Sequence, residues 1–216
     1  MTRIRVLLVD DHVVVRAGYR VLLRDAPEIE VIAEAASGES AYRQYADTAP
    51  DVVVMDLSLP GMGGLEAIRR IMARDAEARI LVFSMHDDVA FVDQALRAGA
   101  RGYVTKRSAP EMLADAIKEI ADGGVYLDPQ VERALREQPG EDRLSRLSPR
   151  EFSIFCMLAE GQSTAEIAQQ LHLSGKTVAN YGTVIKKKLG ARNQAELVYL
   201  ALGRGVAASS PKDPAE

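Results

Sequence analysis

Apolar residues in the first 123 positions follow two alternating patterns. Short runs rich in Val, Ile and Leu predict strands over residues 4–9, 29–33, 51–56, 79–84 and 102–105. Between these runs, apolar residues recur every three or four positions, which predicts helices over residues 13–24, 38–46, 64–74, 89–98 and 110–121. Because strands that alternate with helices form α/β domains, residues 1–123 are expected to fold as a doubly wound, five-stranded parallel sheet with helices on both faces.

The composition of the chain changes after this region. Residues 124–146 contain Asp128-Pro129, Pro139-Gly140 and many charges, which is typical of a linker, and residues 131–137 are a candidate helix within it. The end of the chain, residues 205–216, is small, polar and contains proline, so it is expected to be disordered.

Only helical spacing is found between residues 147 and 204. Ser148, Pro149 and Glu151 match the N-cap, the first helical residue and the capping-box partner of a helix that begins there. Three further helices follow, the third of the set covering residues 175–189. This part of the chain is therefore expected to form a second, smaller, all-α domain of four helices.

The composition is that of an ordinary soluble protein, with 47% hydrophobic and 27% charged residues. The single cysteine, Cys156, has no partner for an internal disulfide or a cysteine-rich metal site, which favours a reducing compartment. No apolar run approaches the roughly 18 residues of a membrane span. The chain enters its first strand directly after Met1-Thr-Arg, so no signal peptide is expected. These features predict a cytoplasmic protein without a membrane partner.

The net charge of −4 conceals a difference between the two regions. Residues 147–204 contain seven Lys or Arg and four Asp or Glu, whereas residues 1–146 contain 19 and 25. An acidic first region and a basic second region indicate different partners, although an excess of this size also arises by chance.

Five polar residues end the predicted strands or come directly after them: Asp10, Asp11, Asp56, Ser84 and Lys106. The carboxyl ends of parallel strands lie along one edge of the sheet, where such folds place their ligands. Each residue alone has an ordinary explanation, since Asp10 and Asp11 could cap a helix and Lys106 could be a solvated loop residue. Their convergence on one edge is the more specific signal.

The chemistry open to this set is limited. Three converging carboxylates repel one another, and a hard divalent cation such as Mg²⁺ relieves that repulsion. A carboxylate can attack phosphorus to give an aspartyl phosphate, while a lysine ammonium neutralises the phosphoryl oxygens and a small hydroxyl bonds to one of them. The three histidines are scattered without ligand spacing, so a zinc site is not expected.

The second region contains two short helices joined by a tight turn, and the second helix ends in Lys186-Lys187-Lys188. This arrangement is that of a helix-turn-helix. A small helical bundle with a solvated basic patch explains the same spacing, so the pattern alone leaves both interpretations open.

Four stretches of the first region resemble the receiver domain of two-component response regulators, which has a flavodoxin-like fold. They are Leu7–His12, Val54–Gly61, Phe83-Ser84 and Gly102–Lys106, and the likeness spans about residues 3–123. It implies that Asp56 accepts phosphate from a sensor histidine kinase. One departure is Arg107, where many receivers have proline.

The resemblance also implies roles for neighbouring residues. Asp11, Asp56 and the backbone carbonyl of Ser58 would bind Mg²⁺ with the help of Asp10. Lys106 and Ser84 would contact the phosphoryl group, and Ser84 with Tyr103 would form a switch pair; without the resemblance, Tyr103 is an ordinary half-buried strand residue. Ser58 and His86 flank the expected phosphoryl site.

Residues 147–204 resemble the LuxR-type helix-turn-helix domain through Leu147–Glu151, Ala159–Ser163, Glu166–Ala168, Lys176–Val178 and Lys188–Gly190. The whole chain is similar to the NarL/FixJ class of regulators. The resemblance implies that helix 175–189 enters the DNA major groove. It also implies that two copies of the protein dimerise through the helix over 193–202. The implied DNA contacts are Lys176, Thr177, Asn180, Tyr181, Thr183, Val184 and Lys188. Ala179 and Tyr181 stand where the family commonly has Lys and His.

The expected protein is a transcription factor that is controlled by phosphorylation and is not a dedicated enzyme, although Mg²⁺-dependent self-phosphorylation and dephosphorylation at Asp56 are expected. Its expected partners are a sensor histidine kinase, double-stranded DNA and a second copy of the chain, and RNA polymerase is a candidate. One alternative is an aspartyl-nucleophile phosphatase, but Ser58 stands where such enzymes need a second aspartate. Another is a phosphorelay module that acts through protein partners alone.

Overall fold

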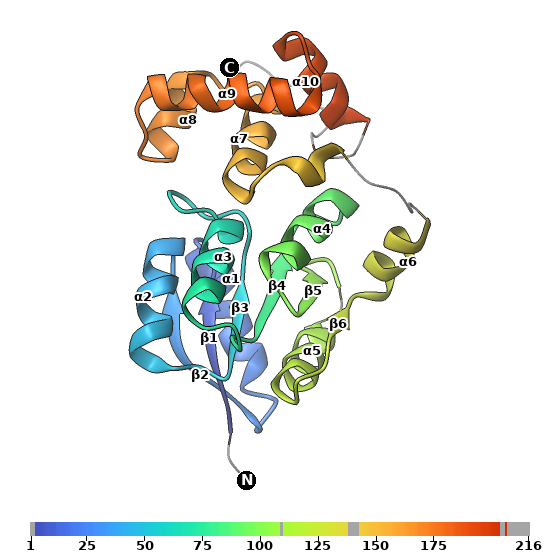
Figure 1. Ribbon diagram of the computed structural model, residues 1–216. Coiled ribbons are helices and arrows are strands. Elements are labelled where there is room, and N and C mark those ends of the chain that lie inside the picture. Colours follow the sequence, from blue (N-terminus) through green and yellow to red (C-terminus); the bar gives the residue numbers. More distant parts are fainter. Residues whose placement is uncertain (1–2, 109, 138–142, 204–205, 207–216) are drawn as a thin grey trace, which may run out of the picture. The chain divides into compact units, whose positions relative to one another are not determined.

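The computed structural model describes residues 3–108, 110–137, 143–203 and 206 (Figure 1). The chain divides into two compact units, Met1–Gly140 and Glu141–Glu216. The tail that was expected to be disordered, residues 205–216, lies outside the described residues except for Val206. In the part of the chain that is described, no helix is long and apolar enough to cross a membrane.

The first unit contains one sheet in which all neighbouring strands are parallel, in the order β2-β1-β3-β4-β5-β6. The strands are β1 (Ile4–Val9), β2 (Ile29–Ala35), β3 (Val52–Met55), β4 (Ile80–Ser84), β5 (Gly102–Thr105) and β6 (Tyr126–Leu127). The prediction of a parallel α/β sheet is confirmed, but the predicted number of five strands is wrong. The sixth strand has only two residues, too few for any periodicity, and it forms because the free edge of β5 accepts it as a partner.

Helices cover both faces of this sheet (Figure 1). The core cluster on one face joins the sheet to residues of α1 and α5, whereas α2 packs on α3 and α3 on α4. Their bounds are α1 (Val13–Leu23), α2 (Gly38–Thr48), α3 (Gly64–Arg74), α4 (Val89–Ala98) and α5 (Pro110–Ala121). Because both faces are covered, β3 is buried along its whole length, as its unbroken apolar sequence predicts.

The stretch expected as a linker contributes structure to both units. Besides β6, it contains α6 (Pro129–Glu137), which contacts α4 within the first unit. Val131 of α6 is buried, at 1% exposure. The 3₁₀ helix Arg143–Arg146 opens the described part of the second unit, where Leu144 is buried. Thus α6 is seated on the first unit by an apolar residue as well as by its connection to β6.

The described part of the second unit is helical. It contains α7 (Pro149–Ala159), α8 (Thr164–Gln170), α9 (Gly175–Leu189) and α10 (Gln194–Leu202). The capping box predicted at the start of α7 is present, because Glu151 N–H donates to Ser148 Oγ and Ser148 N–H donates to the Glu151 carboxylate. A second capping box opens α8. Phe152, Phe155 and Ile185 are fully buried between the helices.

Candidate functional site

The polar residues that follow the strands of the first unit meet at one sheet edge. Asp10 follows β1, Asp56 follows β3, and Lys106 follows β5. The register sets Val9 beside Met55, so the two aspartates begin their loops side by side, and Asp56 N–H donates to the carbonyl of Val9. Gly64 permits this loop, because a Cβ at that position would overlap the carbonyl oxygen of Asp56.

Lys106 joins the two aspartates. Its Nζ lies 2.7 Å from Asp10 Oδ2 and 2.7 Å from Asp56 Oδ2. The lysine side chain is 7% exposed, and both aspartate side chains are 3% exposed. Burial alone would lower the pKa of Lys106, but the hydrogen bonds and charges of Asp10 and Asp56 outweigh it and raise that pKa. The lysine is therefore charged at neutral pH, in a largely dry setting that strengthens its attraction for oxygen anions.

Asp11 faces the same edge but is not bonded to Lys106. Asp10, Asp11 and His12 each offer a ligand atom, and these atoms lie within 4.8 Å of one another. Asp11 Oδ1 is buried and accepts no hydrogen bond from the described residues, although His12 Nδ1 lies 2.7 Å from it. His12 was not predicted as a ligand, because the three histidines lack ligand spacing, but it lies directly after two aspartates in the chain.

Ser84 and Tyr103 both bond to the backbone of one residue, His86. Ser84 is fully buried, and its Oγ accepts a hydrogen bond from His86 N–H at 3.3 Å. Tyr103 is also fully buried, and its hydroxyl donates to the His86 carbonyl at 2.7 Å. Burial is the main reason that the pKa of Tyr103 is raised. The two residues that were predicted to act as a pair are thus linked through His86.

The loops after β3 and β4 also touch. Ser58 Oγ lies 3.1 Å from His86 Nε2, and the imidazole stacks on Phe91 with ring centroids 3.9 Å apart. Burial lowers the pKa of His86, although Asp56 acts in the opposite direction. Ser58 N–H donates to Asp56 Oδ1 at 3.3 Å. The Ser58 hydroxyl and the His86 imidazole therefore lie together beside Asp56.

The predicted DNA contacts in the second unit all lie on the exposed or half-exposed side of α9. Two of the hydroxyls bond locally: Thr177 Oγ1 lies 2.8 Å from Ser174 Oγ, and Thr183 Oγ1 donates to the Ala179 carbonyl. Lys188 Nζ lies 2.6 Å from the buried Glu151 carboxylate. Lys188 therefore holds α9 against α7, a role that the sequence analysis missed.

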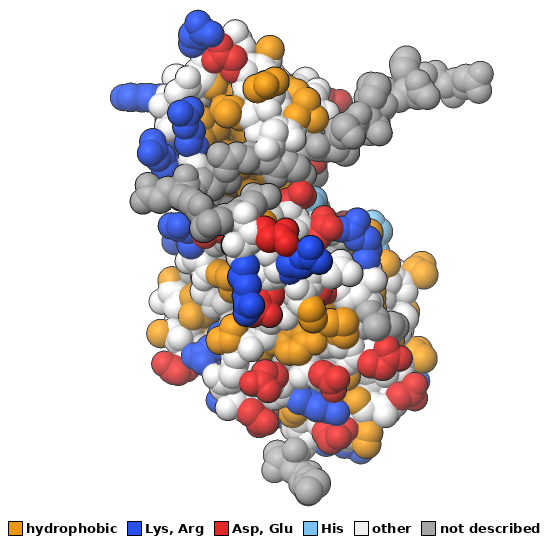
Figure 2. Space-filling model, turned by 90° about the vertical axis from the view of Figure 1, so that its right-hand side faces the viewer, with side chains coloured by type: hydrophobic (Ala, Val, Ile, Leu, Met, Phe, Trp, Pro, Cys, Tyr) orange, Lys and Arg blue, Asp and Glu red, His pale blue; other side chains and the backbone are white. Residues whose placement is uncertain are grey.

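Charged side chains are distributed differently on the two units. On the face of the second unit that Figure 2 draws, Lys and Arg side chains gather along one side, whereas acidic side chains are frequent on the first unit.

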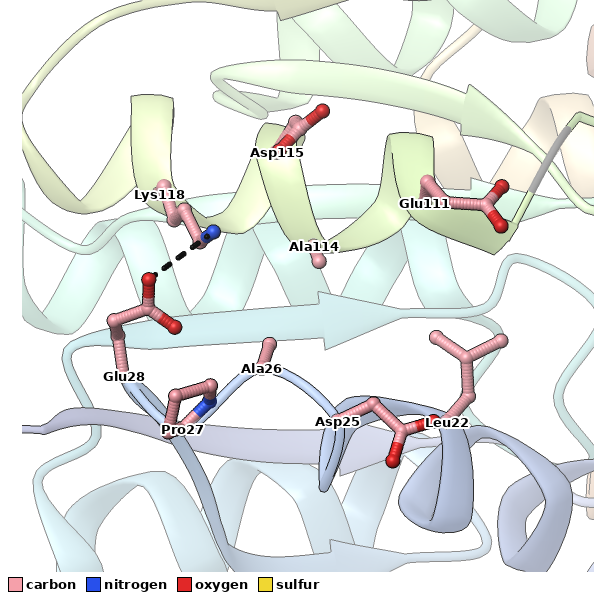
Figure 3. A pocket seen from close by; sticks show the side chains of 9 residues that line it. All are labelled: Leu22, Asp25, Ala26, Pro27, Glu28, Glu111, Ala114, Asp115 and Lys118. Atoms are coloured by element: carbon pink, nitrogen blue, oxygen red, sulfur yellow. Dashed lines mark ion pairs between the residues drawn. The ribbon is translucent and has the colours of Figure 1, made fainter.

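The hollows described for the first unit are not lined by the carboxylates at the strand ends. One of about 540 Å³ runs between the α1–β2 connection and α5, where Lys118 of α5 pairs with Glu28 (Figure 3).

The chain matches two known families. Residues 6–118 match the response regulator receiver domain, and residues 145–201 match the bacterial regulatory proteins of the luxR family. The first match alone covers more than half of the chain. The protein belongs to the two-component response regulators. It has a receiver domain and a LuxR-type DNA-binding domain, as the NarL/FixJ class does, and this combination is that of a transcription factor.

Relatives of this response regulator match it over most of its length. The transcriptional activator protein ExaE of Pseudomonas putida is 41% identical over 207 residues, which are 93% of this chain and 97% of ExaE. A LuxR-family response regulator from Aurantimonas sp. SI85-9A1 is 49% identical with a TM-score of 0.62, over 63% of this chain and 97% of that one. RcsB of Salmonella enterica serovar Typhimurium, bound to the promoter P1flhDC with the phosphomimetic BeF3-, is 27% identical with a TM-score of 0.70, over 92% of this chain and 98% of that one.

Proposed function

We propose that Asp56 is the phosphoacceptor of this response regulator and takes its phosphate from the histidine of a sensor kinase. The observation that carries this proposal is the Lys106 ammonium at 2.7 Å from both Asp56 and Asp10. An ammonium held there is positioned to neutralise a phosphoryl oxygen on Asp56. Ser84, fully buried at the end of β4, supplies the hydroxyl for a second oxygen.

The acidic residues fit a hard divalent cation. Asp11 Oδ1 is buried and has no hydrogen-bond donor among the described residues, which makes it the natural first ligand. We assign Asp11, Asp56 and the Ser58 carbonyl as the Mg²⁺ ligands, with Asp10 in support. The ion would supply positive charge beside the phosphoryl oxygens, while Lys106 holds the opposite side. Self-phosphorylation from small phosphodonors and self-dephosphorylation belong to the same proposal.

Phosphate on Asp56 is proposed to act through Ser84 and Tyr103. Both bond to the backbone of His86, one to its N–H and one to its carbonyl. If Ser84 turns to bond a phosphoryl oxygen, its bond to His86 N–H is lost, and the connection between β4 and α4 must rearrange. Tyr103 follows this change because its hydroxyl has the His86 carbonyl as its acceptor.

The output is proposed to be double-stranded DNA bound by a dimer. The α9 helix would enter the major groove, with Lys176, Thr177 and Lys188 near phosphates and Asn180, Tyr181, Thr183 and Val184 near base edges. The 79% exposed Tyr199 of α10 supports a contact with a second copy. RcsB, whose structure matches 92% of this chain, was solved bound to promoter DNA. The proposed location is the cytoplasm, and RNA polymerase is the proposed target at the promoter.

One experiment on the full chain tests acceptor and output together. The protein is incubated with Mg²⁺ and acetyl phosphate, its intact mass is measured, and its binding to promoter DNA is followed at rising salt. We expect one added phosphate in the native protein and none in Asp56→Ala, with tighter, salt-sensitive DNA binding after phosphorylation. Phosphate retained by Asp56→Ala would contradict the acceptor assignment. DNA binding that neither phosphate nor salt affects would contradict the output.

A further inference from the structure

Lys106 lies in a loop without regular secondary structure, between the end of β5 and the start of α5. Its backbone N–H donates to the Ser84 carbonyl at 2.8 Å, and its ammonium reaches Asp10 and Asp56. These bonds hold the lysine itself. Thr105, directly before the lysine, and Ser108, two residues after it, direct their hydroxyls to a carboxylate outside the site described above.

That carboxylate belongs to Asp128, which is 2% exposed. Ser108 Oγ donates to Asp128 Oδ2, and Thr105 Oγ1 lies 3.4 Å from the same oxygen. The two hydroxyls also lie 2.7 Å from each other. The other oxygen, Asp128 Oδ1, accepts a hydrogen bond from Gln130 N–H at 2.9 Å in the first turn of α6. The two oxygens of this buried carboxylate therefore bond to two different segments: Oδ2 to the loop after β5, and Oδ1 to the start of α6.

The backbone of Asp128 strengthens the same junction. Its N–H donates to the carbonyl of Tyr103 in β5 at 2.9 Å, and its carbonyl accepts from Glu132 N–H in α6 at 2.9 Å. Buried carboxylates are stable only when N–H and O–H groups satisfy their oxygens, and charge-assisted bonds of this kind are stronger than neutral ones. Asp128 thus joins the loop that carries Lys106 to the start of α6.

We propose that Asp128 is a positioning residue for phosphoryl transfer, which holds the Thr105–Ser108 turn so that Lys106 points at Asp56. This inference rests on the proposed function, in which Asp56 is the phosphoacceptor. The same carboxylate caps α6, the last described helix before the second unit in the chain. The position of Lys106 and the seating of α6 are therefore coupled, and any change in one biases the other.

A helix cap alone does not account for Asp128. An N-cap needs one oxygen for an N–H of the first turn, and Oδ1 fulfils that requirement. Oδ2 is directed instead at Ser108, 20 positions earlier in the chain. A residue that only capped α6 would leave this second oxygen to solvent, whereas here it is buried against two hydroxyls.

Substitutions can separate the two functions of this side chain. Asp128→Ser keeps a hydroxyl that caps α6 but is too short to reach the loop. Ser108→Ala removes the shorter of the two loop contacts to Oδ2, leaves only the long one from Thr105, and keeps the cap intact. Asp128→Asn keeps an oxygen for Gln130 and an amide that can donate to the loop hydroxyls. Ser153→Ala is a matched control, because the Ser153 hydroxyl bonds only to the Pro149 carbonyl in α7.

The measurement is the rate at which full-length protein gains phosphate from acetyl phosphate with Mg²⁺, followed by intact mass, with circular dichroism and thermal unfolding on the same samples. Losing one positioning bond of ordinary strength lowers the rate roughly 3- to 10-fold. We expect this loss in Asp128→Ser and in Ser108→Ala, with no further loss in the double variant because both act on one link. Asp128→Asn and Ser153→Ala are expected to stay within about 2-fold of the native rate.

Several outcomes would overturn the inference. Native rates in folded Asp128→Ser and Ser108→Ala would show that Asp128 caps α6 only, and losses that multiply in the double variant would show two unrelated effects. If Asp128→Ser does not fold, Ser108→Ala alone decides between these outcomes. A native protein that takes no phosphate on Asp56 would refute the proposed function instead, so the two failures are distinguishable.

Discussion

Removing the charge of Lys106 tests the electrostatics of the receiver site most directly. Lys106→Met keeps most of the length and the apolar stem of the side chain but removes the ammonium. In the native protein that ammonium is the donor to Asp10 Oδ2 and Asp56 Oδ2, and all three side chains are at most 7% exposed. The variant leaves two buried carboxylates facing each other without the cation between them.

The expected loss follows from that geometry. Removing one partner of a buried ion pair costs about 3–5 kcal/mol, mainly because the remaining charge stays desolvated. We expect a loss in this range at pH 7 without Mg²⁺, which for a domain of this size lowers its melting temperature by about 10–15 °C. Added Mg²⁺ should reduce the loss, because a divalent cation between the two carboxylates relieves their repulsion.

The assay is urea and thermal unfolding of the full chain in chelator, with hydrogen exchange of the β3 and β5 amides to assign the loss to the first unit. Lys118→Met is the matched control, since Lys118 pairs with the exposed Glu28 at 3.4 Å and should contribute about 0–1 kcal/mol. A loss below about 1 kcal/mol for Lys106→Met, or one of equal size with and without Mg²⁺, would refute the reasoning.

Three further predictions concern other parts of the chain. Asp11→Asn should weaken Mg²⁺ binding, measured by calorimetry, at least 10-fold while leaving the fold intact, because its buried Oδ1 has no donor among the described residues. In the second unit, burial would raise the pKa of Glu151, but the bonds from Lys188 and the helix start outweigh it and lower that pKa. The stabilisation that ionised Glu151 provides is therefore complete above the ordinary glutamate pKa of about 4.3 and is lost as pH falls below that value. Glu151→Gln should accordingly make the free energy of unfolding less dependent on pH on the acid side. Gly64→Ala should prevent native folding of the first unit, seen as lost thermal transition and lost phosphorylation, because its Cβ would overlap the Asp56 carbonyl.

Much of the site could be predicted from sequence because each residue follows a strand directly. The apolar run Val52–Met55 predicts a strand buried on both faces, and that run places Asp56 at the ligand-binding edge. The contacts that escaped prediction join separate loops. His86 reaches Ser58 from 28 positions away, and Ser108 reaches Asp128 from 20 positions away. Loop contacts have no periodicity, so nothing in the chain marks them in advance.

The sequence by itself determined the alternation of strands and helices, the starts of α7 and α9, and the two families to which the parts of the chain belong. These features depend on neighbours within a few positions, through side-chain spacing and capping bonds. The tertiary structure alone decided the pairing of β6 with β5, the bridge from Lys106 to residues 96 and 50 positions away, and the second role of Lys188. Each of these contacts joins groups that are far apart in the chain. Which hydrogen-bonding and charged groups become partners is decided only when folding brings those segments together.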